Sequence, residues 1–479
     1  MSFISLEFAI FLVIVFLLYW FVFGRSLKWQ NLLVMVASYV FYGWWDWHFL
    51  LLIAFTSFCS WSSGILIAKC TTDKKRKMVV AANITVNLLI LCAFKYYDFF
   101  VTEFAQIFHF NSEKMLLRVI LPVGISFYTF QALSYSIDVY RKKIEPTKDI
   151  VAFFAYVSFF PQLVAGPIER ATNLLPQFER PRTFDSDQAI DGCRQILWGL
   201  FKKMVVADNC AVYVNQVFGN YHSHTGITLL LAAILFTFQI YGDFSGYSDV
   251  SIGTAKLFGI RLMRNFNVPY FSRDIAEFWR RWHISLTTWF RDYLYIPLGG
   301  SRVSKAKIIR NTFVIFLVSG LWHGANWTFL AWGAYHAFLF LPLILCGKNR
   351  RYRDVVAENS FLPSLREFGQ MLLTFMLVVI GWILFRSDSI GQAWEYICGI
   401  LNPGSLKESY LYAKRLSVRP TTLMVVIMIA VEWLQRKKEH GLDLSGVKSQ
   451  PLRVAIYYAI IAVILVMFGG QQTFIYFQF

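Results

Sequence analysis

The chain alternates long apolar runs with short polar loops along most of its length. Such runs predict membrane-spanning helices, because about 20 apolar residues cross a bilayer. Only Glu7 interrupts the first run. No basic segment precedes that run and no small-residue cleavage site follows it, so we expect a retained helix and not a signal peptide. The expected spans are 3–23, 32–45, 48–68, 78–97, 116–140, 227–240, 308–346, 371–385, 421–434 and 454–468.

Basic residues gather in alternate loops of the first half. Arg25 and Lys28 follow the first span, residues 74–77 follow the third, and residues 141–143 follow the fifth. The loops between them lack such clusters. Basic loops stay on the cytoplasmic side, so this pattern predicts an N-terminus outside the cytoplasm.

The middle of the chain is less regular. Residues 151–164 are too few for a comfortable span, and Pro161 interrupts them, which predicts a re-entrant or interfacial piece. Residues 188–218 are amphipathic, and residues 271–296 look interfacial. The fold class we expect is all-α: a polytopic integral membrane protein with about ten to twelve transmembrane helices. We expect a single membrane domain over residues 1–479.

Composition supports this class. Of the 479 residues, 57% are hydrophobic and only 16% are charged, whereas soluble proteins carry about 25% charged residues. The net charge of +17 would suggest nucleic acid in a soluble protein. Here the topology of basic loops accounts for most of it, and we expect no nucleic-acid partner. Seven cysteines without paired spacing predict buried helix residues, and neither a disulfide framework nor a metal site.

His323 is the histidine placed deepest in an apolar stretch, within Leu321-Trp322-His323-Gly324-Ala325-Asn326-Trp327. Ionisable groups inside a membrane are functional candidates, and a neutral imidazole suits a general base. A structural histidine held by interhelical hydrogen bonds is the alternative. Asn326 is expected to orient the imidazole, to stabilise an oxyanion, or simply to join two helices. On one uninterrupted helix His336 would face elsewhere, so we interpret it as structural.

A second cluster combines charges and aromatics over residues 271–300. Glu277 and Arg281 have the i,i+4 spacing of a helical ion pair, and His283 follows. Ten Lys/Arg but only three acids lie in residues 261–310. Guanidinium groups bind phosphate well, although anchoring to anionic lipid needs no more than scattered cations.

A polar segment, residues 241–249, follows the apolar run that ends at Ile240. Gly242 and Gly246 most simply allow close helix packing. We expect Asp243 to pair with an arginine of the second cluster, in a structural role. Phosphate-loop, serine-elbow and zinc-protease motifs are absent from the sequence.

Two long motifs resemble the membrane-bound O-acyltransferase family, and within it the alginate O-acetyltransferase branch. They are Glu277-Phe278-Trp279-Arg280-Arg281-Trp282-His283-Ile284-Ser285-Leu286, continuing through residues 291–300, and residues 319–327. Residues 121–128, 162–170 and 474–479 match the same branch. The likeness spans almost the whole chain.

The resemblance implies helices around a central tunnel, and transfer of an acetyl group from cytoplasmic acetyl-coenzyme A, or a similar donor, across the membrane. The product would be an O-acetylated exported polysaccharide such as alginate. Membrane lipid and an extracytoplasmic acceptor or polysaccharide-modifying protein would be partners, and the location would be the bacterial inner membrane. The family's catalytic histidines fall on His323 and His283.

The remaining site residues follow from this resemblance. Asn326 and Trp322 would stabilise the oxyanion or orient the histidine, and Asp243 and Glu277 would support the site. No metal and no permanently bound cofactor is expected. The donor phosphates would be held by Arg280, Arg281, Arg291, Arg302, Lys305, Arg310 and Tyr295.

Two alternatives stay open. The same chemistry suits another acceptor or acyl group: peptidoglycan, another glycan, or D-alanyl transfer to teichoic acid. A polysaccharide-export transporter or scaffold is the alternative of another class, because polar broken helices suit transporters.

Overall fold

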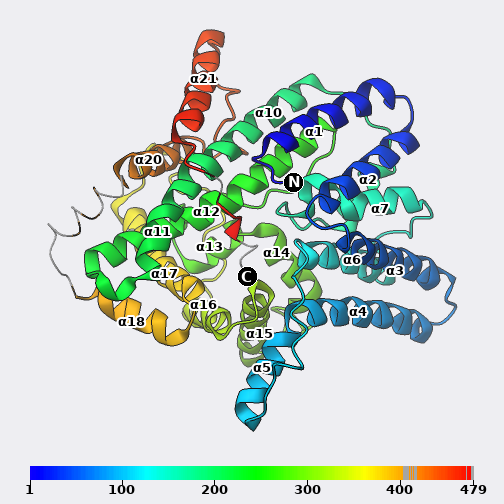
Figure 1. Ribbon diagram of the computed structural model, residues 1–479, viewed down its shortest axis with the longest axis horizontal. Helices are drawn as coiled ribbons and strands as arrows, with labels where there is room; N and C mark the ends of the chain where they lie inside the picture. The colour runs from blue at the N-terminus through cyan, green and yellow to red at the C-terminus, as the bar shows by residue number, and fades with distance from the viewer. Residues whose placement is uncertain (403–408, 410–411, 413, 415–417, 471, 476–479) are drawn as a thin grey trace. The chain divides into compact units, whose positions relative to one another are not determined.

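The computed structural model describes the chain except for residues 403–408, 410–411, 413, 415–417, 471 and 476–479 (Figure 1). All regular structure in the described part is helical, which confirms the predicted class. Most of the C-terminal motif 474–479 lies outside the described residues. Contacts divide the chain into two compact units, Met1–Cys193 with Ser251–Met263, and Arg194–Val250 with Arg264–Phe479. The expected single membrane domain stays a prediction.

Helices of the first unit begin at short polar side chains. Ser5 accepts the amide of Phe8, and Thr72 accepts the amide of Lys75. Such caps satisfy amides that have no partner inside the helix. The elements are α1 (Leu6–Leu17), a π-helical turn (Leu18–Val22), α2 (Leu27–Gly43), α3 (Phe49–Lys69), α4 (Asp73–Lys95), α5 (Tyr97–Phe108), α6 (Ile125–Tyr140), α7 (Ile150–Ser158), α8 (Phe160–Leu163), α9 (Ala171–Phe178) and the start of α10 (Ser186–Leu200).

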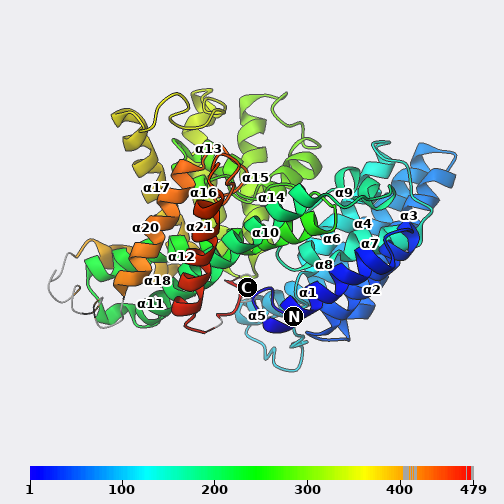
Figure 2. The same ribbon diagram turned by 90° about the horizontal axis from the view of Figure 1, so that it is seen from above.

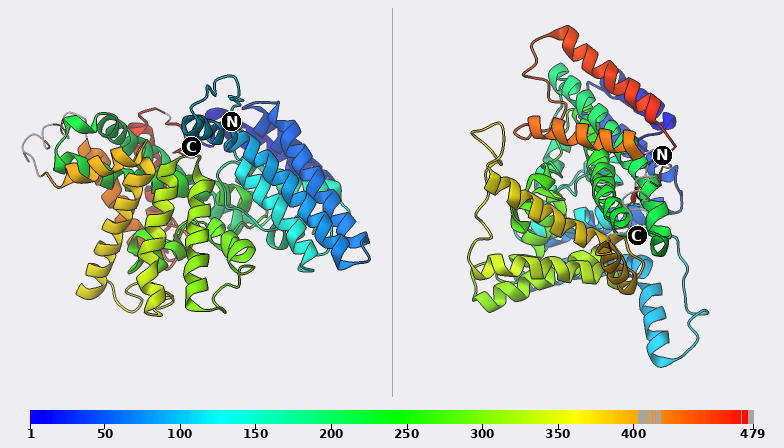
Figure 3. Two further views of the ribbon diagram at one scale, coloured as in Figure 1. Left: turned by 90° about the horizontal axis from the view of Figure 1, so that it is seen from below. Right: turned by 90° about the vertical axis from the view of Figure 1, so that its left-hand side faces the viewer.

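Helices α3, α4 and α6 run side by side in this unit (Figure 3, left). A Cβ at Gly64 would overlap the ring of Tyr135, so the glycine is what lets α3 approach α6. Ser136 joins all three helices, because its hydroxyl lies 2.6 Å from that of Ser63 and accepts a 2.8 Å hydrogen bond from Asn83. Small and polar side chains hold apolar helices together in this way.

Two expectations for this unit were wrong in part. The span predicted over residues 116–140 is helical only from Ile125, because the chain turns at Gly124 with φ 75°. Helix α5 lies where a loop was expected. The predicted interruption in residues 151–164 is confirmed, since α7 ends at Ser158 and α8 starts at Phe160.

The second unit holds the rest of the described helices. Its elements are the end of α10, a π-helical segment (Phe201–Ala207), α11 (Asp208–Gly219), a 3₁₀ turn (Tyr221–Ser223), α12 (Gly226–Leu257) up to Val250, a 3₁₀ turn (Pro269–Phe271), α13 (Ile275–Arg281), α14 (Ile284–Phe290), a π-helical turn (Arg291–Tyr295), α15 (Lys305–His323), α16 (Trp327–Leu345), α17 (Leu365–Arg386), α18 (Ile390–Ile400), α20 (Val418–Leu434) and α21 (Gln450–Met467).

Glycines set the closest helix contacts of this unit. Helices α15 and α16 lie side by side (Figure 2), and a Cβ at Gly320 or Gly333 would overlap the backbone of the facing helix. A Cβ at Gly242 or Gly246 would also come within 3 Å of a carbonyl oxygen in the segment before α11. The close packing predicted for this glycine pair is confirmed.

Six described helices are long and apolar enough to cross a membrane: α3, α4, α12, α16, α17 and α21. The total of ten to twelve spans stays a prediction. The expectation of buried cysteines was wrong for most of them, since Cys210 alone is buried among the seven, all of which lie in the described part. A side chain exposed on an apolar helix can contact lipid. Hydropathy alone therefore does not distinguish a residue buried inside the protein from one that faces lipid.

Candidate active site

His283 occupies a sharp corner between α13 and α14. Asp274 caps α13 by accepting the amide of Glu277, and the helix ends at Arg281. His283 then adopts φ 42° and ψ 55° in the left-handed region. Histidine is among the few residues enriched there, and such a backbone is typical of functional sites. The turn buries the imidazole, which is 1% exposed.

His323 is the last residue of α15, immediately before the break at Gly324. Its side chain is buried, and it lines a cavity of about 50 Å³ together with His283. The hydroxyl residues Thr287 and Ser319 line the same cavity. A water molecule takes about 30 Å³ of liquid, so the space suits one or two waters or a small acyl group.

Sequence reasoning missed Ser319 and Thr287. Each lies four residues from a histidine, Ser319 before His323 and Thr287 after His283. Positions i and i+4 share a helix face. That spacing is the signal that would have identified both hydroxyls.

Trp322 contacts both histidines. Its ring centroid lies 5.0 Å from that of His323 and 5.7 Å from that of His283. Trp332 of α16 meets His323 edge-on at 5.1 Å and also contacts His336 at 5.1 Å. The assumption of one helix through His323 and His336 was therefore wrong, because the break at Gly324 turns α16 back beside α15.

Asn326 caps α16. Its carbonyl oxygen accepts the amide of Thr328 at 3.0 Å, and its amide group donates to the carbonyl of Asp388 at 3.2 Å. An oxyanion role would require the side chain to release Asp388. The structure thus supports the alternative reading of Asn326 as a polar contact between chain segments.

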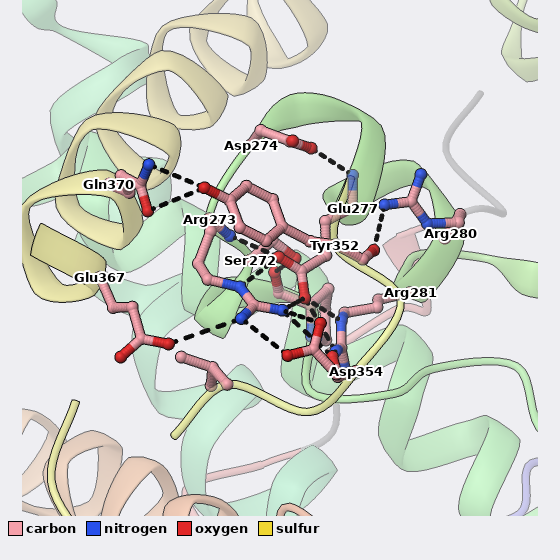
Figure 4. Close-up of polar contacts among 12 residues, drawn as sticks. Ser272, Arg273, Asp274, Glu277, Arg280, Arg281, Tyr352, Asp354, Glu367 and Gln370 are labelled. Atoms are coloured by element: carbon pink, nitrogen blue, oxygen red, sulfur yellow. Dashed lines mark hydrogen bonds and ion pairs between the residues drawn. The ribbon is translucent and has the colours of Figure 1, made fainter. Parts of the chain in front are cut away.

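The expected ion pair of Glu277 and Arg281 is confirmed, with an N–O distance of 2.8 Å (Figure 4). A third member was not foreseen: Arg273 donates to the same carboxylate at 3.1 Å and to Asp354 at 3.1 Å. Arg281 also donates to the backbone carbonyl of Asp354. All three side chains of the triad are buried, and the donors of Arg281 already serve Glu277 and two carbonyls. These contacts favour a structural role for Arg281, and its binding of donor phosphates stays a prediction.

The other predicted phosphate ligands lie on the outside. Arg280 is exposed, but it donates to the carbonyls of Asn349 and Tyr352. Arg291 pairs with the neighbouring acid Asp292. Arg302 and Lys305 are exposed, Arg310 contacts the side chain of Asn311, and Tyr295 is half-buried in the π-helical turn after α14.

Asp243 pairs with a lysine and not with an arginine of the second cluster. Lys203 lies 2.7 Å from Asp243 and 2.6 Å from Asp208. The amide of Ile475 donates to Asp243 at 2.7 Å. The expectation failed because residues 201–207, and not α13, provide the neighbouring cation on this face of α12.

Burial controls the protonation state of His283. His283 lies outside the six candidate spans, and burial lowers its pKa to about 3, so it is a neutral imidazole at physiological pH. Within the described residues, no group of three or more His, Cys, Asp or Glu side chains is placed to hold a metal ion. The neutral imidazole of His283, together with His323 and the hydroxyl residues Thr287 and Ser319 at the same cavity, suits proton transfer and hydrogen bonding.

Comparison with known proteins identifies the family. Residues 77–359 match the model of the membrane-bound O-acyltransferase family. The chain is 40% identical to the "Probable alginate O-acetylase" of Pseudomonas aeruginosa, over 84% of this chain and 76% of the relative. It is 31% identical to the peptidoglycan O-acetyltransferase of Helicobacter pylori, over 95% and 93%. It is also 27% identical to the teichoic acid D-alanyltransferase of Bacillus subtilis, over 55% and 68%. The chain therefore belongs to the membrane-bound O-acyltransferase family and is a multi-pass integral membrane acyltransferase.

Proposed function

We propose that this protein moves an acetyl group from cytoplasmic acetyl-coenzyme A, or a similar donor, across the membrane for O-acetylation of an exported polysaccharide such as alginate. The observation that supports it best is the shared cavity of His283 and His323 in a chain 40% identical to a probable alginate O-acetylase. The proposed location is the bacterial inner membrane, with the N-terminus outside the cytoplasm.

His323 acts as the general base in this mechanism. Its imidazole takes the proton of an acceptor hydroxyl, and the oxygen attacks the thioester carbonyl carbon. The tetrahedral intermediate then collapses, the carbon–sulfur bond breaks, and the imidazolium returns its proton to the leaving thiolate. Such acid–base assistance contributes about 10²–10⁴-fold to a rate.

The other cavity groups have supporting roles. Neutral His283 hydrogen-bonds and orients the donor thioester. The residues Ser319 and Thr287 line the same small space. In this mechanism Ser319 donates to the developing oxyanion, whereas the Thr287 hydroxyl already donates to the carbonyl of Trp282 at 3.3 Å. Trp322 holds both imidazoles in position. The acceptor hydroxyl belongs to an extracytoplasmic protein or to the polysaccharide itself.

One finding favours a different acceptor for the same acetyl-transfer reaction. The peptidoglycan O-acetyltransferase of Helicobacter pylori matches nearly the full length of both chains, at 31% identity. Peptidoglycan is therefore the second candidate acceptor.

The test compares wild type with His323→Gln in nanodiscs. Thiol release from acetyl-coenzyme A is measured with oligomannuronate or a peptidoglycan fragment supplied, and the acetylated product is identified by mass spectrometry. His336→Gln is the matched control, because His336 is buried and contacts the same Trp332 but does not line the cavity. We expect a loss of at least 100-fold in His323→Gln only. Equal activity in both variants would remove His323 as the base, and inactive wild type with either acceptor would refute acetyl transfer from this donor.

A further inference from the structure

The segment between α16 and α17 carries an unusual concentration of positive charge. Residues 348–353 contain four cations and no acid: Lys348, Arg350, Arg351 and Arg353. All four are exposed. We call this segment the basic loop. Like charges at such spacing repel, which favours a mobile segment unless other contacts hold the backbone.

Arg280 and Arg281 of α13, and Arg273 just before this helix, hold the backbone of the basic loop and its flank. Arg280 donates to the carbonyls of Asn349, at 2.9 Å, and Tyr352. Just after the loop, the carbonyl of Asp354 accepts from Arg273 at 3.1 Å and from Arg281 at 2.8 Å (Figure 4).

The ring of Tyr352 adds a further fixed point. It lies 4.3 Å from the guanidinium carbon of Arg273, and its hydroxyl bonds to Gln370 (Figure 4). The carbonyls of Asn349 and Tyr352 thus bind α13, while the four cationic side chains of the loop stay exposed.

A second basic segment is tied to the loop. Arg350 donates to the hydroxyl of Ser301 at 3.0 Å. Ser301 precedes Arg302, and Lys305 and Lys307 follow in the first turn of α15, where no acid is present. The two segments therefore form one continuous cationic surface.

We propose that the basic loop binds the phosphate groups of the acyl donor, with Arg273, Arg280 and Arg281 supporting it from behind. Guanidinium groups pair with phosphate in a planar, two-point geometry that needs a fixed backbone. The supporting helix α13 leads directly into His283, so a donor bound on the loop is held by the element that carries the site. This inference rests on the proposed coenzyme A donor.

Binding to anionic lipid is the less suitable explanation. Attraction to a lipid surface needs cations near the interface but no fixed arrangement. Here the backbone is held by donors from α13 and from Arg273 just before it, and two of these donors, Arg273 and Arg281, are buried. That arrangement fits a ligand with phosphates at set positions.

The test measures binding, so it does not depend on turnover. Coenzyme A and pantetheine, which lacks the nucleotide phosphates, are titrated by calorimetry into protein in nanodiscs of neutral lipid. The variant is Arg351→Gln/Arg353→Gln, which removes two exposed charges outside the catalytic cavity. Arg351→Lys/Arg353→Lys retains charge, and Lys74→Gln/Lys75→Gln removes two exposed cations from the first turn of α4.

We expect wild type to bind coenzyme A more tightly than pantetheine. The double glutamine variant should lose about tenfold in affinity for coenzyme A and nothing for pantetheine, since each exposed charge pair contributes up to about 1 kcal/mol and 1.4 kcal/mol is tenfold. The Arg351→Lys/Arg353→Lys variant should recover most of the lost affinity. The control variant Lys74→Gln/Lys75→Gln should bind coenzyme A as tightly as wild type. The preference should weaken with added salt.

Three results would overturn the inference. They are equal binding of coenzyme A and pantetheine by wild type, an unchanged preference in the double glutamine variant, and a preference that does not weaken with added salt. None of these results touches acetyl transfer itself, which the His323 experiment decides separately.

Discussion

His283 and His323 line one cavity although they belong to different helical segments. One stands in a left-handed corner between two short helices, and the other ends a long helix. Trp322 contacts both rings from the side. Two imidazoles lining the same small space are an arrangement suited to binding a thioester and activating a hydroxyl.

Replacing Trp322 with phenylalanine should lower kcat by about tenfold while the protein stays folded. A smaller ring leaves both imidazoles less well positioned, and small displacements at a reacting centre are costly. Steady-state acetyl transfer and the apparent melting temperature provide the measurements. Trp198→Phe, at another buried tryptophan, serves as control. Full activity in Trp322→Phe would show that the ring contact has no positioning role.

Glu277→Gln should destabilise the protein by about 3–5 kcal/mol, because it removes the buried carboxylate that two buried arginines share. Arg273 and Arg281 expose only 3% and 9% of their side chains. The control, Asp292→Asn, breaks an exposed pair with Arg291 and should cost at most about 1 kcal/mol. Thermal unfolding in nanodiscs distinguishes the two, and similar losses in both variants would contradict a structural role for the triad.

Stability should fall in acid partly because of His283. Its folded pKa of about 3 lies below the unfolded value of about 6.5, so the unfolded state binds the proton more tightly. This contribution to stability is complete above pH 6.5 and is lost as the pH falls towards 3. At pH 5 the loss of unfolding free energy is about 2 kcal/mol. His283→Asn, which tolerates the left-handed backbone, should flatten the fall of melting temperature between pH 7 and pH 5. His222→Gln, at an exposed histidine, should leave it unchanged, and the same slope in all three proteins would refute the effect.

Gly320→Ala should destabilise the α15–α16 pair by about 2 kcal/mol or more. The new methyl group would overlap the backbone of Phe329, which cannot move aside as a flexible side chain can. Gly369 of α17 has open space where its Cβ would stand, so Gly369→Ala should stabilise the protein by about 0.5–1 kcal/mol through helix propensity. Opposite shifts in melting temperature are the expected result. An unchanged melting temperature in Gly320→Ala would show that α15 and α16 can move apart at no cost in stability.

The two histidine motifs were predictable from sequence, but the turn of α16 back beside α15 was not, because the apolar run 308–346 continues across the break at Gly324. The i,i+4 pair of Glu277 and Arg281 was predictable too, because helical spacing is a local property. The partners of Arg273 and Arg280 were not. They lie about 70 to 80 positions further along the chain, and no periodicity links α13 to a loop that far away.

The sequence by itself determined the helical membrane class, the family and the two histidine motifs, since each depends on composition or on residues within a few turns of one another. The tertiary structure decided which cations are free to bind a ligand. Burial and backbone contacts commit Arg281 and Arg273 to Glu277, whereas the same contacts leave the basic loop exposed and ordered. A charge count cannot make that distinction, because the role of an arginine depends on what its five donors already bind.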